Sequence, residues 1–277
     1  MASKRNHPIG IFDSGYGGLT ILKEIRKLLP AYDYIYLGDN ARTPYGTRSF
    51  EVVYEYTLEA VKRLFEMGCE LVILACNTAS AKALRTIQQS DLPKIDPSKR
   101  VLGVIRPSVE EVVQLTRNGH VGILGTNGTV SSLSYVLELD KLSEGKLAVY
   151  QEACPMWVPI VENNEINTPG ADYFIEKNII NLVQQDSGID TIVLGCTHYP
   201  LLISSIRKFL SEEVVIVEQG PVVANKLKDY LERHPEMEFQ CSTGGGINYF
   251  TTEKADIFNA KASFFMNEKI SAESIHI

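Results

Sequence analysis

Short runs of apolar, often β-branched residues alternate along the chain with longer segments in which apolar residues recur at helical spacing. The short runs predict strands, and longer segments such as 19–29 and 49–68 predict amphipathic helices, the second ended by Gly68 as a C-cap. This alternation is typical of parallel strands joined by crossover helices, so it predicts an α/β fold with mostly parallel sheets. The predicted strands are 8–12, 34–38, 71–75, 101–105, 120–124, 146–150, 191–195 and 214–218.

The two halves of the chain resemble each other. IGIFDS at 9–14 is similar to VGILGT at 121–126, and LVILACNT at 71–78 is similar to TIVLGCTH at 191–198. All βαβ repeats share some likeness, but a cysteine directly after the third strand of both halves favours a true duplication. The segment 90–100, with two prolines and five charges, is the best candidate for a domain boundary.

Composition narrows the range of partners. The chain has 277 residues, 44% hydrophobic and 22% charged, with a net charge of −7 and no basic run. We therefore expect neither nucleic acid nor an anionic membrane as a partner. No apolar run is long enough to span a membrane, and the opening MASKRNHP lacks the apolar core of a signal peptide. These features predict a cytoplasmic protein.

Asp13, Cys76 and Cys196 each stand at the carboxyl end of a predicted strand, before small or polar residues and a helical pattern. Ligands bind at this edge of open parallel sheets, where helix N-termini attract carboxylates or phosphates. N-capping alone would explain any single polar residue in these turns, but the convergence of three such turns favours a site. The polar residues concerned are Ser14, Asn77, Thr78 and Thr197.

The two strand-end cysteines suggest a specific chemistry. The five cysteines show neither a CxxC motif nor the spacing of a zinc site, so most are expected to be free, buried thiols. Two cysteines that face each other across similar half-sites could act as base and acid, because one thiol can ionise while the other stays protonated. Such a pair could invert the α-carbon of an amino acid. His198 and Asp13 could tune the thiols or relay protons, although a histidine in a helical turn often has only a structural role.

Two loops are further candidates for ligand contact. DSGYGG fits no nucleotide-binding pattern, and we interpret its glycines as allowing a sharp turn beside a small ligand. The loop 38–49 is longer than a bare connection between a strand and a helix, and long loops in compact domains are often functional. It supplies Asp39, Asn40, Pro44, Tyr45 and Gly46.

Four segments together resemble a known family. DSGYGGLT, LGDNARTPYG, LACNTASA and GCTHYPLL are similar to the signature segments of the cofactor-independent glutamate racemases, in the expected order and across nearly the whole chain. ACNTA and GCTHYPL also occur in the broader aspartate/glutamate racemase superfamily, whereas DSGYGG with DNARTPYG indicates the glutamate branch. The resemblance implies interconversion of L- and D-glutamate, which supplies D-glutamate for peptidoglycan, without pyridoxal phosphate or a metal.

The resemblance also implies roles for individual residues. Cys76 is expected to act on D-glutamate and Cys196 on L-glutamate, with Asp13, Glu162 and His198 as supporting polar residues near the thiols. Glu218 departs from the family pattern, which more often has Asp there, and this puts the geometry of its loop in doubt. The implied substrate contacts are Asp13, Ser14, Tyr45, Gly46, Asn77, Thr78, Thr197 and His198.

The implied fold has two similar, doubly wound, mostly parallel-sheet domains related by pseudo-twofold symmetry, with the active site in the cleft between them. Residues 1–98 and 212–277 are assigned to the first domain, and residues 99–211 to the second. The tail after Gly246 is expected to be a helical segment packed on the first domain. Its aromatic residues are Phe250, Phe258, Phe264 and Phe265.

Three other interpretations stay open. The chain could racemise aspartate or another acidic compound, because the sequence does not show the length of side chain that the cleft accepts. It could be a two-lobed binding protein without chemistry, or Cys76 and Cys196 could form a redox pair. The sequence does not determine whether the chain forms a homodimer, and it contains no motif for a response to a cell-wall precursor.

Overall fold

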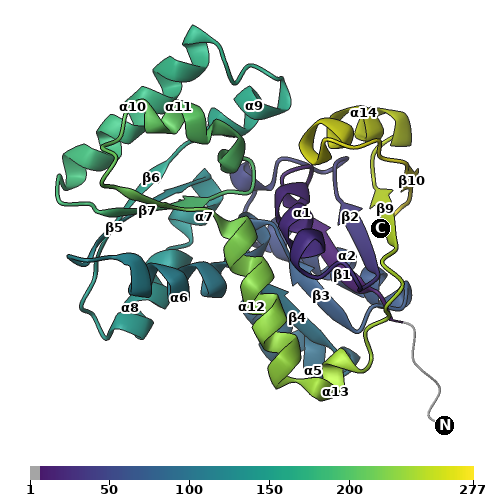
Figure 1. The fold of residues 1–277 in the computed structure, drawn as a ribbon. Coiled ribbons are helices and arrows are strands. Elements are labelled where there is room, and N and C mark those ends of the chain that lie inside the picture. Colours follow the sequence, from purple (N-terminus) through teal and green to yellow (C-terminus); the bar gives the residue numbers. More distant parts are fainter. Residues whose placement is uncertain (1–6) are drawn as a thin grey trace.

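The computed structural model describes residues 7–277, whose strands form two separate sheets (Figure 1). The strands are β1 (Ile9–Asp13), β2 (Tyr34–Gly38), β3 (Leu71–Leu74), β4 (Arg100–Gly103), β5 (His120–Gly125), β6 (Ala148–Ala153), β7 (Thr191–Gly195), β8 (Val215–Val217), β9 (Ile247–Thr251) and β10 (Ala272–Ser274). One sheet has the order β10-β9-β2-β1-β3-β4, and the other has the order β6-β5-β7-β8. All paired strands within both sheets are parallel.

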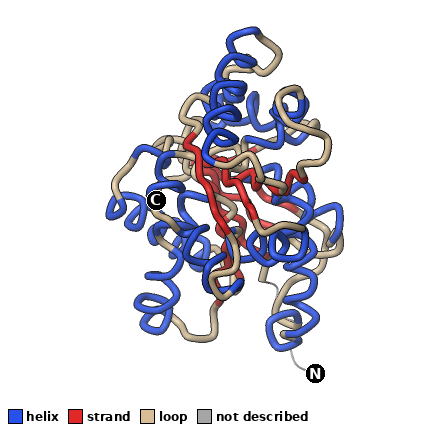
Figure 2. Tube along the Cα trace, turned by 90° about the vertical axis from the view of Figure 1, so that its left-hand side faces the viewer, coloured by secondary structure: helices blue, strands red, loops and turns tan. Residues whose placement is uncertain are grey.

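Helices surround the strands, as the tube view shows (Figure 2). The α-helices are α1 (Gly18–Leu28), α2 (Phe50–Glu66), α3 (Asn77–Lys82), α4 (Leu84–Thr86), α5 (Leu92–Ile95), α6 (Ile105–Leu115), α7 (Asn127–Ser131), α8 (Ser134–Ser143), α9 (Trp157–Glu162), α10 (Pro169–Gln185), α11 (Ile203–Arg207), α12 (Gln219–Arg233), α13 (Pro235–Glu238) and α14 (Ala255–Met266). Two 3-10 turns, η1 (Tyr45–Thr47) and η3 (Tyr199–Leu202), and one π-helical turn, η2 (Ile87–Asp91), complete the helical segments.

The predicted α/β fold with two parallel sheets is confirmed, and all eight expected strands are present. The duplication is visible in the topology. In the order β2-β1-β3-β4 and again in the order β6-β5-β7-β8, the first strand of the half lies between the second and the third, and the fourth lies outside the third. Each half therefore brings the ends of its first and third strands side by side at one edge of its sheet.

Two strands lie on the other side of the expected domain boundaries. β4 pairs with β3 in the six-stranded sheet, although residues 99–211 were assigned to the second domain. β8 pairs with β7 in the four-stranded sheet, although residues 212–277 were assigned to the first. Each half closes its sheet with a fourth strand before the chain leaves it, so the chain crosses between the sheets directly after β4 and directly after β8.

The tail is only partly helical. Helix α14 packs against α1, as expected, with Phe258 and Phe265 stacked on Tyr16 at ring distances of 5.4 and 6.0 Å. The tail also contributes β9, which pairs with β2, and β10, which pairs with β9. The predicted helical segment is present as α14, but the prediction missed these two strands, which form because the open edge of β2 accepts further strands through its backbone N–H and C=O groups.

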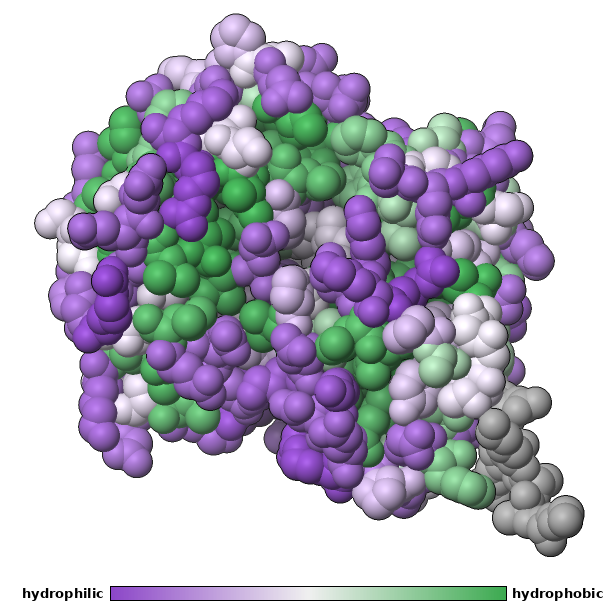
Figure 3. All heavy atoms as spheres, in the orientation of Figure 1, coloured by the Kyte–Doolittle hydropathy of each residue, from purple (hydrophilic) through white to green (hydrophobic). Residues whose placement is uncertain are grey.

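The surface view shows polar residues over much of one face, with apolar patches between them (Figure 3). Within residues 7–277, no helix is long and apolar enough to cross a membrane. The expectation that the chain lacks a signal peptide rests partly on residues 1–6, which lie outside the described residues.

Candidate active site

Cys76 follows β3 and is the N-cap of α3. Its Sγ accepts a hydrogen bond from the Ala79 N–H at 3.4 Å and lies 3.3 Å from Ser14 Oγ. The side chain is buried, with 6% exposed. Burial, followed by the negative charge of Asp13, raises the pKa of Cys76 to about 12. At neutral pH this thiol is protonated, so it is placed to donate a proton.

Asp13 ends β1 and is buried, with 1% exposed. Its Oδ2 accepts a hydrogen bond from the Gly15 N–H at 2.9 Å, but its Oδ1 has no hydrogen-bond partner. Burial raises the pKa of this carboxyl, and the positive charge of His198 opposes that shift. A buried acceptor without a donor is costly, so Oδ1 is suited to receive a donor from a bound ligand.

Cys196 follows β7 and is paired with His198. Its Sγ lies 3.8 Å from His198 Nδ1, and His198 Nε2 lies 3.0 Å from Glu162 Oε1. Burial by itself would lower the pKa of His198, but the hydrogen bonds to Cys196 and Glu162 outweigh it and raise that pKa to about 10. Burial likewise opposes ionisation of Glu162, but the hydrogen bond from His198 keeps its pKa below the usual range. At neutral pH both His198 nitrogens therefore carry protons, one facing Cys196 Sγ and the other Glu162 Oε1.

The turns after β1 and β7 are packed against each other. A Cβ added at Gly17 would lie 2.2 Å from Thr197 Oγ1 and 2.5 Å from His198 Nδ1, so only glycine fits there. Thr20 Oγ1 donates to the Thr197 carbonyl at 2.9 Å. The electrostatic interaction with Cys196 also contributes to the raised pKa of Cys76. The three strand ends chosen from the sequence thus meet in one site.

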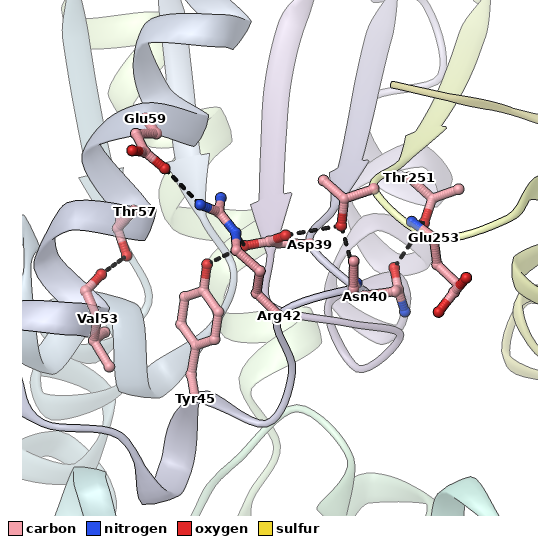
Figure 4. Close-up of polar contacts among 11 residues, drawn as sticks. Asp39, Asn40, Arg42, Tyr45, Val53, Thr57, Glu59, Thr251 and Glu253 are labelled. Atoms are coloured by element: carbon pink, nitrogen blue, oxygen red, sulfur yellow. Dashed lines mark hydrogen bonds and ion pairs between the residues drawn. The ribbon is translucent and has the colours of Figure 1, made fainter. Parts of the chain in front are cut away.

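The loop 38–49 is held by a network around Asp39, which is fully buried (Figure 4). Its Oδ2 accepts hydrogen bonds from the Tyr45 hydroxyl and from Arg42 Nε, the latter at 2.7 Å. Its Oδ1 accepts from Thr252 Oγ1 at 2.8 Å. Tyr45 therefore uses its hydroxyl within the loop, and its contribution to a ligand would come from the backbone.

Gly46 touches the other half of the chain. A Cβ there would lie 2.9 Å from the Cβ of Thr126. Thr126 Oγ1 also lies 3.0 Å from Thr78 Oγ1, so this threonine joins two of the expected substrate-contact segments. The sequence interpretation missed Thr126, although the duplication places it opposite Ser14 in the other half.

Asn77 is engaged with residues that the sequence did not indicate. Its Oδ1 accepts a hydrogen bond from the Tyr135 hydroxyl, and its Nδ2 donates to Gln219 Oε1. Gln219 follows Glu218, the N-cap residue of α12, whose side chain makes no capping hydrogen bond. Helix α12 forms nonetheless, so Glu218 does not disturb the element that begins there. Within residues 7–277, no group of three or more His, Cys, Asp or Glu side chains is arranged to hold a metal ion.

The fold and the site together define a class of protein. This chain has two similar parallel α/β halves, and each half places a cysteine at an equivalent strand end. The two thiols lie in different electrostatic surroundings, because burial and Asp13 raise the pKa of Cys76 whereas Cys196 lies beside His198.

A model of the Asp/Glu/Hydantoin racemase family matches residues 9–226. The chain is 37% identical to the glutamate racemase of Persephonella marina over 270 residues, 97% of each chain. It matches a crystal structure of a glutamate racemase isoform from Bacillus anthracis with a TM-score of 0.89 and 34% identity, over 99% of this chain and 98% of that one. It matches the Francisella tularensis glutamate racemase in complex with D-glutamate with a TM-score of 0.86 and 30% identity, over 98% of both chains.

The chain therefore belongs to the Asp/Glu/Hydantoin racemase family. The resemblance to glutamate racemases that its sequence segments indicated is confirmed.

Proposed function

We propose that this protein interconverts L- and D-glutamate by moving protons between the α-carbon and two cysteines. The observation that carries the proposal is the pair Cys76 and Cys196, placed at equivalent strand ends of the two halves but in different electrostatic surroundings. The names of the relatives, and D-glutamate in one related structure, support glutamate as the substrate.

The direction from L to D follows from the charges in the site. Protonated His198 donates to Cys196 and stabilises its thiolate, which removes the α-proton of L-glutamate. Cys76, a protonated thiol, delivers a proton to the opposite face and becomes the thiolate. The reverse reaction begins from the opposite protonation of the two cysteines. Glu162 keeps His198 charged by accepting from Nε2.

Substrate binding uses groups that the structure leaves available. Asp13 Oδ1, which lacks a donor, is suited to accept from the substrate ammonium. The first N–H groups of the helices after the cysteines are suited to the carboxylates. We assign the remaining contacts as the family resemblance implies, namely to Ser14, Tyr45, Gly46, Asn77, Thr78, Thr197 and His198.

The physiological role that we propose is supply of D-glutamate for peptidoglycan, in the cytoplasm and without a cofactor. The five cysteines are free thiols, which suits a reducing compartment. Aspartate is the alternative substrate. An aspartate racemase homologue from Pyrococcus horikoshii shares 19% identity with this chain and a TM-score of 0.53, a likeness of fold alone. Comparing racemisation of L-glutamate and L-aspartate by circular dichroism separates the two substrates.

The two-thiol mechanism predicts the fate of the α-proton. In deuterated water with L-glutamate as substrate, early D-glutamate should carry deuterium at the α-carbon, while the remaining L-glutamate keeps hydrogen. The reason is that the proton removed and the proton returned reside on different sulfurs, which exchange with solvent between turnovers. Mass spectrometry of the separated enantiomers measures this. Transfer of the original hydrogen to the product would indicate a single base and reject the mechanism.

Single cysteine variants complete the test. Cys196→Ser and Cys76→Ser should both lose racemisation, because a serine hydroxyl is too weak an acid to give a base near neutrality. Elimination of a leaving group from a β-substituted glutamate needs one base only. Cys196→Ser should therefore retain elimination from the D-analogue and Cys76→Ser from the L-analogue. Substrate binding with no turnover in the wild type would instead favour a binding protein.

A further inference from the structure

A closed ring of three buried side chains joins the two halves of the molecule beside Cys76. Tyr135 of α8 donates its hydroxyl proton to Asn77 Oδ1 at 2.8 Å. Gln219 Nε2 donates to the Tyr135 hydroxyl at 2.8 Å, and Asn77 Nδ2 donates to Gln219 Oε1. All three side chains are buried, with Tyr135 0% exposed, Asn77 3% and Gln219 1%. Gln219 Nε2 also lies 3.2 Å from Asn77 Oδ1, so the three side chains are hydrogen-bonded to one another on every side of the ring.

Gln219 also connects the two points at which the chain crosses between the sheets. Its second Nε2 proton is directed to Ser108 Oγ at 2.8 Å, and Ser108 donates to the Val104 carbonyl at 2.7 Å. Val104 follows β4 at the first crossing, and Gln219 follows β8 at the second. The amide is therefore used on both nitrogen protons and on its oxygen, which is costly to disturb in a buried position.

The ring involves or contacts the residues next to both cysteines in the chain. Asn77 is the residue directly after Cys76. Gly195 is the residue directly before Cys196, and a Cβ added there would lie 3.3 Å from Tyr135 Cε2 and 2.9 Å from the Leu124 carbonyl oxygen. Glycine at position 195 thus allows the aromatic side chain of Tyr135 to lie against the end of β7. The hydroxyl of the same side chain donates its hydrogen bond to Asn77.

We propose that the Asn77–Tyr135–Gln219 ring is a spacer that sets the separation of the two thiols, with Tyr135 and Gln219 as positioning residues. This inference rests on the proposed two-thiol racemisation. Inversion requires both sulfurs within reach of one α-carbon at the same time, and small errors of position are costly in such steps. A reaction that uses one thiol does not depend on their separation.

The test compares two reactions of the same variant. Gln219→Met removes the amide but keeps an unbranched side chain of similar length. We expect it to lower kcat/KM for glutamate racemisation by about tenfold or more. Elimination from the D- and L-forms of a β-substituted glutamate, each of which needs one thiol, should fall by less than about threefold. Thermal unfolding of each variant reports the folded fraction, so that both rates refer to folded protein.

Two further variants separate a spacer from general loss of structure. Tyr135→Phe keeps the aromatic side chain against Gly195 but removes the hydroxyl, which opens the hydrogen-bonded ring. It should therefore change the ratio of racemisation to elimination in the same direction as Gln219→Met. Ser108→Ala also removes one hydrogen bond of Gln219 but leaves the ring closed, so this ratio should stay near that of the wild type. Equal loss of racemisation and elimination in Gln219→Met would overturn the spacer proposal. A change of the ratio in Ser108→Ala as large as that in Gln219→Met would overturn it as well.

Failure of the proposed function has a different signature. If Cys76→Ser and Cys196→Ser do not show opposite preferences in elimination, the two-thiol assignment itself is wrong. If they do, and the ring variants leave the ratio unchanged, the assignment stands and only the spacer is rejected.

Discussion

His198 holds its proton because Cys196 and Glu162 flank its two ring nitrogens. Its pKa of about 10 in the folded protein compares with about 6.5 for an unperturbed histidine. The folded state therefore binds this proton more tightly than the unfolded state. The resulting stabilisation is complete below about pH 6.5 and is lost as the pH rises to about 10.

We expect His198→Asn to lower the free energy of unfolding by roughly 1–3 kcal/mol at pH 6 and by progressively less toward pH 10. Urea unfolding of wild type and variant across this range measures the difference. His234→Asn, which removes an exposed imidazole beside Glu236, controls for the loss of a histidine as such. A wild-type-to-variant difference that does not decline with pH would contradict the assigned charge of His198.

Gly17 is the residue at which the two halves of the site leave no space for a side chain. Gly17→Ala should abolish most racemase activity and destabilise the fold by about 1–3 kcal/mol, because the added methyl overlaps Thr197 and His198. Gly170→Ala, in α10, is the matched control, because the nearest atom to the added methyl would be Thr168 Oγ1 at 3.8 Å. It should be neutral or stabilising by up to about 1 kcal/mol. Full activity in Gly17→Ala would contradict the observed packing.

At the scale of elements, the turns that begin the helices carry the site, and α12 begins without a side-chain cap. Glu218 occupies the N-cap position, but its longer side chain makes no hydrogen bond to the first turn. Glu218→Asp should stabilise the protein by about 0.5–1 kcal/mol, because aspartate is among the best N-cap residues. Chemical denaturation measures the change, and Glu212→Asp, in an exposed turn, is the control. Equal effects of both substitutions would show that capping is not the cause.

At the scale of the whole molecule, the close packing of the two halves buries both strand-end thiols, each with 6% exposed. The other three cysteines are also buried and free. We expect a thiol reagent to react slowly with the native protein and to find five thiols after denaturation, with or without prior mild oxidation. Three thiols after oxidation would instead show a bridge and favour the redox interpretation of Cys76 and Cys196.

Local patterns were sufficient to predict the strands, the parallel sheets, the duplication and the meeting of Asp13, Cys76 and Cys196. Hydrophobic periodicity reports how a short segment is buried, and in parallel sheets strand ends from distant segments gather at one edge. Asp13, Cys76 and Cys196 stand at strand ends, so their location depends only on features that lie close together in the chain, whereas Glu162 ends helix α9 and its place beside His198 depends on packing.

Other features depend on contacts between residues far apart in the sequence. The pairing of β9 with β2, and the membership of β4 and β8 in their sheets, reflect which open edge is available after the halves fold. The partners of Asn77, namely Tyr135 and Gln219, come from helices of different segments, and no local pattern marks them. Side-chain hydrogen bonds need atoms within a few ångströms and the correct direction, a condition that arises only when the two halves pack together.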